Sequence, residues 1–271
     1  MAAPVVTIVD VGALAIHGAA PFYAPLSALG KARVIGFEPI EAECARLNAD
    51  APPGHQFLPY ALGDGTERTL RICNAPMTSS LYEPNLPLLS MFQALPELVR
   101  VVRRQPLTTK RLDDVPEAAG TDFLKLDVQG AELDVIRGAS KTLSSVTIVQ
   151  TEVEFVPLYE GQPLFADVDM ALRAHGFMFH KFLGLSGRAF KPFLRDKNPN
   201  LPIGQILWSD AVYVRDFTRF DELAPDQLLK LALVLIECYR SVDLAGLALQ
   251  AYDRLTGDDL GKRYLGAFGV S

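Results

Sequence analysis

Residues 122–134 of this chain read Asp-Phe-Leu-Lys-Leu-Asp-Val-Gln-Gly-Ala-Glu-Leu-Asp. Residues 123–128 are mostly apolar and predict a buried strand. Gly130 ends this pattern, and after it the apolar side chains of residues 132–143 recur at the spacing of a helix. A strand, a polar corner and a helix in this order are typical of one unit of an α/β sheet.

The polar corner of this unit carries charged side chains where packing alone would not favour them. Lys125 lies within the predicted strand, and Asp127 and Gln129 lie at its end. Removing a charge from water is costly unless the charge is paired or bound. Ligands of open α/β sheets bind beyond the carboxyl ends of the strands. The corner therefore predicts a ligand crevice at this end of the sheet.

The composition of the chain excludes some classes of function. Its 271 residues are 49% hydrophobic, which is enough for a sizeable core and argues against disorder. The net charge of −6 argues against a nucleic-acid partner, because binding phosphates needs a basic face. The three cysteines are scattered and have no metal-type or redox spacing, so we expect a reduced, intracellular setting.

No segment of the sequence predicts membrane insertion. The apolar run at residues 5–11 is interrupted by Asp10 and has no basic residue before it, which favours a first strand over a signal peptide. The run at residues 228–236 contains Lys230 and is about half as long as a membrane span. We therefore expect a soluble, cytoplasmic protein without a membrane span.

Strands and helices alternate through the first two thirds of the chain. Helices are predicted at residues 21–29, around Cys44, at 132–143 and at 168–175. Short apolar strands that alternate with amphipathic helices predict a parallel sheet with helices on both faces. The predicted strands are residues 5–11, 33–38, 56–60, 123–128, 146–153, 177–183 and 211–215, with a short extra strand at 69–73.

The remaining segments suggest how the chain is divided. Residues 1–220 are expected to form the α/β domain, and residues 221–271 a C-terminal extension built as a helical hairpin. The hairpin is expected either to add packing to the core or to form a homodimer or partner surface. Residues 74–106 are rich in Pro, Ser and Leu, and residues 184–209 form a long excursion, so both are expected to shape a substrate pocket.

Three strand ends carry residues suited to a nucleoside-type ligand. Gly12 follows the first strand, where a glycine allows a tight turn and close approach of a ligand. Glu38 follows the second strand, where a carboxylate can accept hydrogen bonds from ribose hydroxyls. Asp64 follows the third, placed to accept from an adenine amino group. Each has a simpler explanation, as a turn glycine, a helix N-terminal acid and a turn former, but their order strengthens the ligand interpretation.

The motifs at these strand ends together resemble the FkbM-type methyltransferase family over about residues 5–216. The matching stretches are Val9-Asp-Val-Gly-Ala, Gly36-Phe-Glu-Pro, Ala61-Leu-Gly-Asp, Ser79-Ser-Leu, the residues 122–132 quoted above, Phe155-Val-Pro-Leu-Tyr-Glu-Gly-Gln-Pro-Leu-Phe and Gly204-Gln-Ile-Leu-Trp-Ser-Asp-Ala-Val-Tyr. The resemblance implies a Rossmann-like class I methyltransferase fold with a seven-stranded sheet. It also implies S-adenosylmethionine as methyl donor and O-methylation of a small molecule, such as a sugar or natural product.

The resemblance also implies roles for individual residues. Gly12 lines the methionine part of the donor, Glu38 binds its ribose and Asp64 lies near its adenine, while Asp127 sits under the reacting methyl group. The full set implied to bind the donor is Asp10, Gly12, Ala13, Glu38, Pro39, Leu62, Asp64 and Asp127. The loop Leu14-Ala-Ile-His departs from relatives that have Asn or a Gly-rich pair there.

Transfer of a methyl group to an alcohol needs a base, which typically contributes about 10²–10⁴-fold. Asp127 is the best-placed candidate, and a helix cap is its structural alternative. Lys125, beside it in the motif, is also counted among the expected catalytic residues. Glu152 and Glu154 share one strand face, where they could share a proton, hold a metal or pair with Lys125. His180 is a further candidate that could equally be a core histidine. No His/Cys cluster calls for a metal, so none is expected.

Two other functions are consistent with the same sheet. A nicotinamide-dependent oxidoreductase shares the acidic ribose residue, but this chain has Gly12 and Gly18 where that class has a three-glycine loop. A non-catalytic binding or scaffold protein that kept the fold is the second alternative. The apolar Leu14 and Ile16 in the first loop favour it, and its interaction surface would be the C-terminal helices.

Overall fold

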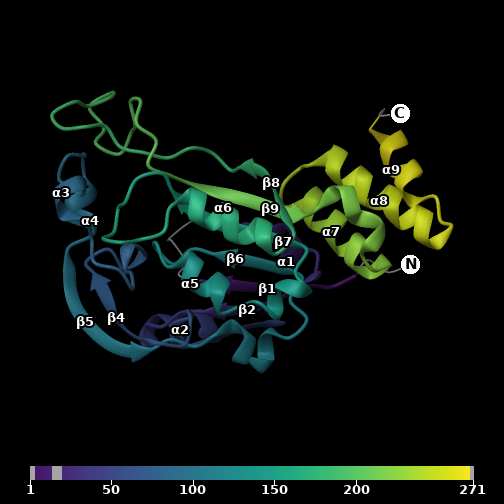
Figure 1. The fold of residues 1–271 in the computed structure, drawn as a ribbon, viewed down its shortest axis with the longest axis horizontal. Coiled ribbons are helices and arrows are strands. Elements are labelled where there is room, and N and C mark those ends of the chain that lie inside the picture. Colours follow the sequence, from purple (N-terminus) through teal and green to yellow (C-terminus); the bar gives the residue numbers. More distant parts are fainter. Residues whose placement is uncertain (1–3, 14–19, 269–271) are drawn as a thin grey trace.

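The computed structural model describes residues 4–13 and 20–268 of the chain (Figure 1). Seven strands form one sheet in the order β3-β2-β1-β6-β7-β9-β8. They are β1 (Val6–Val11), β2 (Ala32–Phe37), β3 (His55–Leu58), β6 (Phe123–Leu126), β7 (Ile148–Glu154), β8 (Phe177–Phe182) and β9 (Trp208–Arg215). The predicted seven-stranded, mostly parallel Rossmann-like sheet is confirmed.

The direction of the strands places the ligand crevice. The five strands β3, β2, β1, β6 and β7 are parallel to one another. Strand β9 is antiparallel to both of its neighbours, β7 and β8. The chain builds outward from β1 through β2 to β3 and then returns to β6 on the other side of β1. Because open α/β sheets bind ligands where the strand order reverses, the carboxyl ends of β1 and β6 are where a ligand is expected.

One face of the sheet is covered by α5 (Glu132–Arg137) and α6 (Phe165–Ala174). Val9, Leu124 and Val149 of the strands are fully buried against these helices. The same side chains alternate along their strands with residues that face the other side, as the period of a strand requires. The helix predicted at residues 132–143 is shorter than expected, because α5 ends at Arg137 and a 3₁₀ turn, Thr142–Ser144, follows.

The opposite face is covered by α1 (Ala24–Ala28), α7 (Pro225–Glu237) and α8 (Val242–Thr256). Leu228, Leu231 and Leu235 of α7 are fully buried in one cluster with Ile8 and Phe123 of the strands. The C-terminal helices therefore complete the core of the sheet. The α7–α8 pair forms the expected hairpin, and a third helix that the sequence did not predict, α9 (Leu260–Ala267), follows it (Figure 1). The domain boundary at residue 220 and a homodimer through these helices stay predictions.

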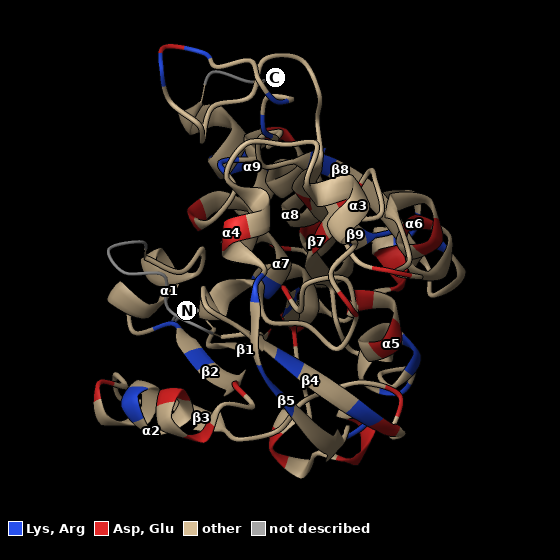
Figure 2. Ribbon diagram, turned by 90° about the vertical axis from the view of Figure 1, so that its left-hand side faces the viewer, with Lys and Arg blue, Asp and Glu red and all other residues tan. Residues whose placement is uncertain are grey.

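Residues 74–106, for which the sequence predicts no helix or strand, form small elements beyond the strand ends. They are α3 (Leu86–Leu89) and α4 (Leu95–Leu98), and β5 (Val101–Thr108), which pairs antiparallel with β4 (Glu67–Cys73). The sequence predicts β4 but not β5, because β5 is largely exposed and carries Arg103 and Arg104. Figure 2 shows the β4–β5 pair, with its blue basic residues, in front of the sheet.

Two further segments frame this end of the sheet. Helix α2 (Glu41–Ala49) packs beside β3, where Asn48 hydrogen bonds to both backbone groups of Phe57. The excursion between β8 and β9 extends beyond the strand ends, at the upper left of Figure 1. It contacts the α3–α4 segment, where the Phe92 and Phe190 rings stack with centroids 4.6 Å apart. Among the helices of the described ranges, none has the length and apolar character needed to cross a bilayer.

A substitution in α7 tests whether the C-terminal helices belong to the core. We expect Leu231→Ala to lower the free energy of unfolding by about 2–5 kcal/mol, because it leaves a cavity against the sheet. The control Leu247→Ala, at a position of α8 that is 36% exposed, should cost much less. Denaturant unfolding of both variants measures this. A Leu231→Ala protein with wild-type stability, or with a separate transition for the helices alone, would contradict shared packing.

Candidate active site

A cavity of about 320 Å³ opens at the carboxyl ends of the parallel strands. Its walls come from the ends of β1, β2, β6 and β7, from the segment after β3, and from the α3–α4 segment. The volume lies within the range of small-molecule sites, roughly 300–1,000 Å³. The cavity therefore occupies the place that the strand order indicates for a ligand.

A buried ion pair lies on the sheet beside this cavity. Asp10 of β1 and Lys125 of β6 are paired in register, and Lys125 Nζ lies 3.1 Å from Asp10 Oδ1. Tyr23 donates a 2.8 Å hydrogen bond to the other carboxylate oxygen of Asp10. Burial disfavours the charge of Lys125, but the carboxylates of Asp10 and Asp127 outweigh burial and raise the pKa of Lys125. The pair thus holds the ends of β1 and β6 together next to Asp127.

Asp127 and Glu152 are joined by the side chain of Gln129. Gln129 Nε2 donates to Asp127 Oδ1 at 3.1 Å and to Glu152 Oε2 at 2.6 Å. The hydroxyl of Tyr159 donates to Gln129 Oε1, and that of Ser80 donates to the backbone oxygen of Gln129. Gln129 has a left-handed backbone, with φ +55°, which costs energy for a side chain of this type. Its neighbours therefore fix a strained residue between two cavity carboxyls.

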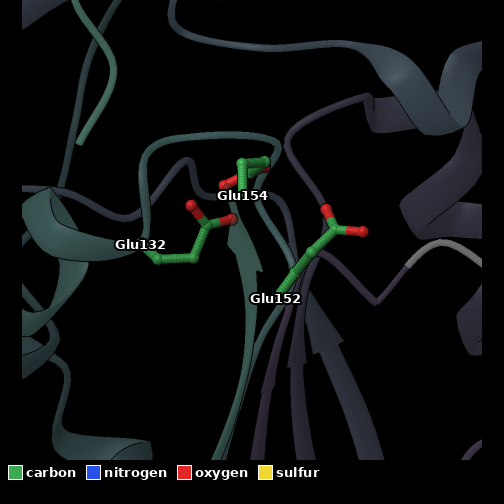
Figure 3. Close-up of side chains that lie close together, drawn as sticks. All are labelled: Glu132, Glu152 and Glu154. Atoms are coloured by element: carbon green, nitrogen blue, oxygen red, sulfur yellow. The ribbon is translucent and has the colours of Figure 1, made fainter. Parts of the chain in front are cut away.

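Three glutamates form a carboxyl cluster: Glu132, at the start of α5, and Glu152 and Glu154 of β7 (Figure 3). One oxygen from each lies within 4.8 Å of the others. Burial raises the pKa of Glu132 to about 7. Burial, followed by the charges of neighbouring carboxyls, raises the pKa of Glu152 and Glu154 well above the ordinary range. The surroundings of the cluster therefore favour the protonated, uncharged form of these side chains more than water does.

The other end of the cavity is formed by the segments after β2 and β3. Glu38 is 4% exposed, lines the cavity and accepts a 2.7 Å hydrogen bond from the backbone N–H of Ile40. Burial raises the pKa of Glu38 to about 7, although the Ile40 N–H bond opposes this shift. Tyr60 and Leu62 provide an aromatic and an apolar wall, and Lys110 Nζ lies 3.5 Å from the centre of the Tyr60 ring. This end can hold an apolar ring and hydroxyl groups.

Most of the residues around this cavity fall within a region that matches a known enzyme family. A family model described as the methyltransferase FkbM domain matches residues 10–179, which include the strand ends and the carboxyl cluster. The chain belongs to the FkbM methyltransferase family. Enzymes of this family take their methyl group from S-adenosylmethionine, which is therefore the methyl donor. The nicotinamide alternative is not supported.

Individual relatives match more narrowly. The 2-O-methyltransferase NoeI of Sinorhizobium fredii is 47% identical over 66 residues, which are 23% of this chain and 27% of that protein. The aligned part thus spans about a quarter of that relative's length.

Two solved structures show a general likeness. Magnesium protoporphyrin IX methyltransferase (ChlM) from Synechocystis PCC 6803 with bound SAM is 13% identical, with 79% of this chain and 71% of that chain covered and a TM-score of 0.40. A mutant of the 16S rRNA (adenine(1408)-N(1))-methyltransferase from Catenulisporales acidiphilia with cosubstrate SAM is 12% identical, with 79% and 87% covered and a TM-score of 0.38.

The structure of this FkbM methyltransferase brings seven of the predicted site residues together. They line the cavity, and they are Gly12, Glu38, Pro39, Leu62, Asp127, Glu152 and Glu154. Gly12 has φ +79°, and a Cβ there would lie 1.9 Å from the backbone oxygen of Asp127. A glycine is thus required where β1 and β6 end side by side. The loop Leu14–His17 lies outside the described residues.

Five other predicted site residues do not line the cavity. Asp10 and Lys125 are engaged in the ion pair beside it, so Lys125 pairs with Asp10 and Asp127, and not with Glu152 or Glu154 as one alternative held. Ala13 packs in a small cluster with α2. Asp64 accepts hydrogen bonds from the backbone N–H and the hydroxyl of Thr66. It therefore acts as a turn-forming residue, which was the alternative explanation for it.

His180 is the fifth of these residues. Its Nε2 lies 2.7 Å from the hydroxyl of Ser241, just before α8. The register between β8 and β9 shifts between Phe179 and Lys181, so His180 sits at an irregular point of the strand. Lys181 also bonds to the Ser241 hydroxyl. The structure therefore ties His180 to the C-terminal helices and does not bring it to the cavity.

Sequence reasoning missed several groups that shape the site. Gln129 and Ser80 stood in the quoted motifs, but their mutual hydrogen bond joins segments 49 residues apart. Tyr159 also stands in a quoted motif, but nothing in its local sequence indicates that its hydroxyl bonds to Gln129, 30 residues before it. Tyr60 and Arg188 carry no local signal at all. The absence of a metal stays a prediction, because the three glutamates of the cluster lie close enough together to hold a cation.

The carboxyl cluster predicts how stability depends on pH. The folded protein holds protons on carboxyls such as Glu154 that an unfolded chain releases near pH 4.5, so the free energy of unfolding should fall as pH rises from about 5.5 to 8. We expect Glu154→Gln to raise the free energy of unfolding at pH 8 by about 1 kcal/mol or more and to make this decline shallower. Thermal unfolding across this pH range measures both.

The control for this prediction is Glu160→Gln, because Glu160 is an exposed glutamate outside the cluster. Its pH profile should match the wild type. If Glu154→Gln and Glu160→Gln give the same slope, Glu154 is ionised in the folded protein and the account of the cluster is wrong.

Proposed function

We propose that this FkbM methyltransferase is an O-methyltransferase that transfers the methyl group of S-adenosylmethionine to a hydroxyl group of a small molecule. The observation that carries the proposal is the continuous cavity that joins Glu38 at one end to Asp127 and Glu152 further in. One end offers a nucleoside site, and the other offers carboxyls beside the place where a hydroxyl would have to lose its proton.

The residues of the cavity suit the chemical groups of the donor. The carboxylate of Glu38 can accept hydrogen bonds from ribose hydroxyls, and Tyr60 and Leu62 provide walls for adenine. Gly12 lines the cavity between them and Asp127, and its missing side chain allows close approach. The donor supplies an activated methyl group, so the protein has to orient the acceptor and exclude water. Orientation alone can contribute about 7–11 kcal/mol to lowering a barrier.

Asp127 is the group we assign to the acceptor hydroxyl. Its side chain is 35% exposed, whereas Lys125 beside it is 14% exposed, so Asp127 is the member of the ion-pair network that reaches the cavity. Lys125 Nζ lies 3.7 Å from Asp127 Oδ2 and Gln129 donates to Oδ1, which together fix the carboxylate. Asp127 can then accept the hydroxyl proton while Glu152, whose pKa is raised by burial, stays neutral beside it.

For the acceptor, we propose a chemical class: a small molecule with a free hydroxyl group. The matched relative is named a 2-O-methyltransferase, and the acid-lined inner part of this cavity suits a hydroxyl nucleophile better than a group that is already basic. Sugars and hydroxylated natural products are the acceptors to try first. A non-catalytic, donor-binding protein is the second candidate, because the loop Leu14–His17 differs from the family pattern.

The donor site predicts a pH-dependent affinity. Glu38 must be ionised to accept from two ribose hydroxyls, and its pKa is about 7, so S-adenosylhomocysteine should bind more tightly at pH 8 than at pH 6, with proton release at the lower pH. Calorimetry in buffers of different ionisation enthalpy measures both effects. Glu38→Gln should weaken binding by about tenfold and remove the proton release.

The matched control is Glu41→Gln, which replaces an exposed glutamate of α2 close in sequence to Glu38. It should keep the wild-type affinity and proton release. If Glu38→Gln binds S-adenosylhomocysteine as tightly as the wild type does, Glu38 lies outside the donor site. If the wild type itself does not bind S-adenosylhomocysteine, the proposed function is wrong.

The assignment of the base gives a prediction on turnover. Asp127→Asn should lower methyl transfer by about 10²–10⁴-fold while S-adenosylhomocysteine affinity changes little. S-adenosylhomocysteine release is measured with a panel of hydroxylated sugars and hydroxy acids. Asp114→Asn, at an exposed aspartate remote from the cavity, is the control and should keep full activity. Wild-type turnover by Asp127→Asn would remove Asp127 as the base, and donor binding without turnover on any acceptor would favour the non-catalytic candidate.

A further inference from the structure

The part of the cavity farthest from Glu38 has an apolar wall. It lies under α3 and α4, where a separate hydrophobic cluster joins these helices to the start of β9. Such a wall suits an apolar part of a ligand, and no residue of it can act on a hydroxyl group. The cavity-lining members of this wall are Leu89, Leu95, Leu98, Val99 and Leu158.

One cation, Arg188, lies in this apolar part of the cavity. Its guanidinium carbon lies 5.1 Å from the centre of the Trp208 ring, and both residues line the cavity. Arg188 Nη1 donates to the neighbouring backbone oxygen of Gly187. Arg188 Nε is buried from solvent without a hydrogen-bond partner, and within the described ranges no carboxylate lies within 4.0 Å of the guanidinium.

The backbone around Arg188 is firmly held. Ser186 exchanges backbone hydrogen bonds with Leu207 and Trp208 on one side. Ala189 is 2% exposed, and its oxygen accepts a hydrogen bond from the backbone N–H of Gln93 on the other side. A Cβ at Gly187 would lie 2.2 Å from the backbone oxygen of Gln205, so the two sides of the excursion touch there. Arg188 is thus presented from a fixed loop.

A guanidinium in this position is costly to the protein. It has five N–H donors in a planar fork that matches carboxylate, phosphate and sulfate groups. Burial lowers the pKa of Arg188, because no neighbouring charge compensates for the water it has lost. Arg215, which is half-buried like Arg188, is bonded instead: its guanidinium donates to the backbone oxygens of Leu143, Val146 and His175. Arg188 therefore differs from an arginine that supports the fold.

We propose that the methyl acceptor carries an anionic group, a carboxylate, phosphate or sulfate, which binds to Arg188 above Trp208 while its apolar part lies against the α3–α4 wall. This inference rests on the proposed function and names the class of its acceptor. The acceptor would then span the cavity, with its anionic end at Arg188 and its hydroxyl at Asp127. The raised pKa values of Glu152 and Glu154 favour their uncharged forms, which lessens the repulsion between an anion and this part of the cavity.

The test uses simple amphipathic probes on the full chain. Hexyl phosphate, hexyl sulfate and hexanoate are titrated by calorimetry into the free protein and into its S-adenosylhomocysteine complex, with 1-hexanol as the neutral control. We expect at least one anion to bind about tenfold or more tightly than hexanol, because hydrogen bonds to charged groups are the strong ones. The three anions distinguish the phosphate, sulfate and carboxylate sources of the charge.

Two variants locate the binding. Arg188→Met should remove the preference for the anion over hexanol, and Arg188→Lys should keep only part of it, because a lysine lacks the planar fork. The matched control is Arg195→Met, on the same excursion, where the arginine side chain is 60% exposed. It should leave probe binding unchanged.

A stability measurement separates this role from a structural one. Removing an uncompensated buried charge costs little, so Arg188→Met should have an unchanged or raised Tm. Equal binding of anions and hexanol to the wild type, retained anion preference in Arg188→Met, or a clear fall in its Tm would each overturn the inference. Loss of S-adenosylhomocysteine binding counts against the proposed function alone, because the probes also report on Arg188 in the free protein.

Discussion

The buried pair of Asp10 and Lys125 is the interaction on which the site depends. Both charges have been taken out of water on the face of the sheet, so each needs the other, and breaking such a pair typically costs about 3–5 kcal/mol. Tyr23 completes the bonding of Asp10, and Lys125 reaches from the pair to Asp127. The ends of β1 and β6 are thereby held together, and the carboxylate of Asp127 is fixed where the cavity begins.

Two members of the carboxyl cluster, Glu152 and Glu154, line the cavity. Burial raises the pKa of all three glutamates of the cluster, and the charges of neighbouring carboxyls raise the pKa of Glu152 and Glu154 further. Glu132 also braces the turn after β6, because its carboxylate accepts from the backbone N–H groups of Val128 and Gly130. The cluster thus has two roles: Glu132 shapes the turn that presents Asp127, and the raised pKa values of Glu152 and Glu154 favour their uncharged forms at the cavity.

Sequence patterns anticipate the sheet because strand periodicity is local. The apolar residues of β1, β6 and β7 alternate or run continuously within a few positions, so these strands can be predicted from their own residues alone. β5 was missed because its exposed, arginine-rich sequence is stabilised by pairing with β4, which lies well before it along the chain. The helices after residue 220 were predicted as helices, but their packing on the sheet depends on Leu228 and Leu231 meeting Ile8 and Phe123 from far along the chain.

For the site, the chain's own motifs were enough to name Gly12, Glu38 and Asp127, since each follows a strand and strand ends of a parallel sheet share one edge. They also indicated the family. Which carboxyls have raised pKa values, which cation pairs with Asp10, and which arginine has no carboxylate beside it among the described residues depend on burial and on neighbours distant in sequence. Lys125 and Arg188 carry the same charge in the printed sequence. Packing gives the first an aspartate across the sheet and leaves the second at the cavity with its Nε unbonded, and the proposed role of Arg188 rests on that difference.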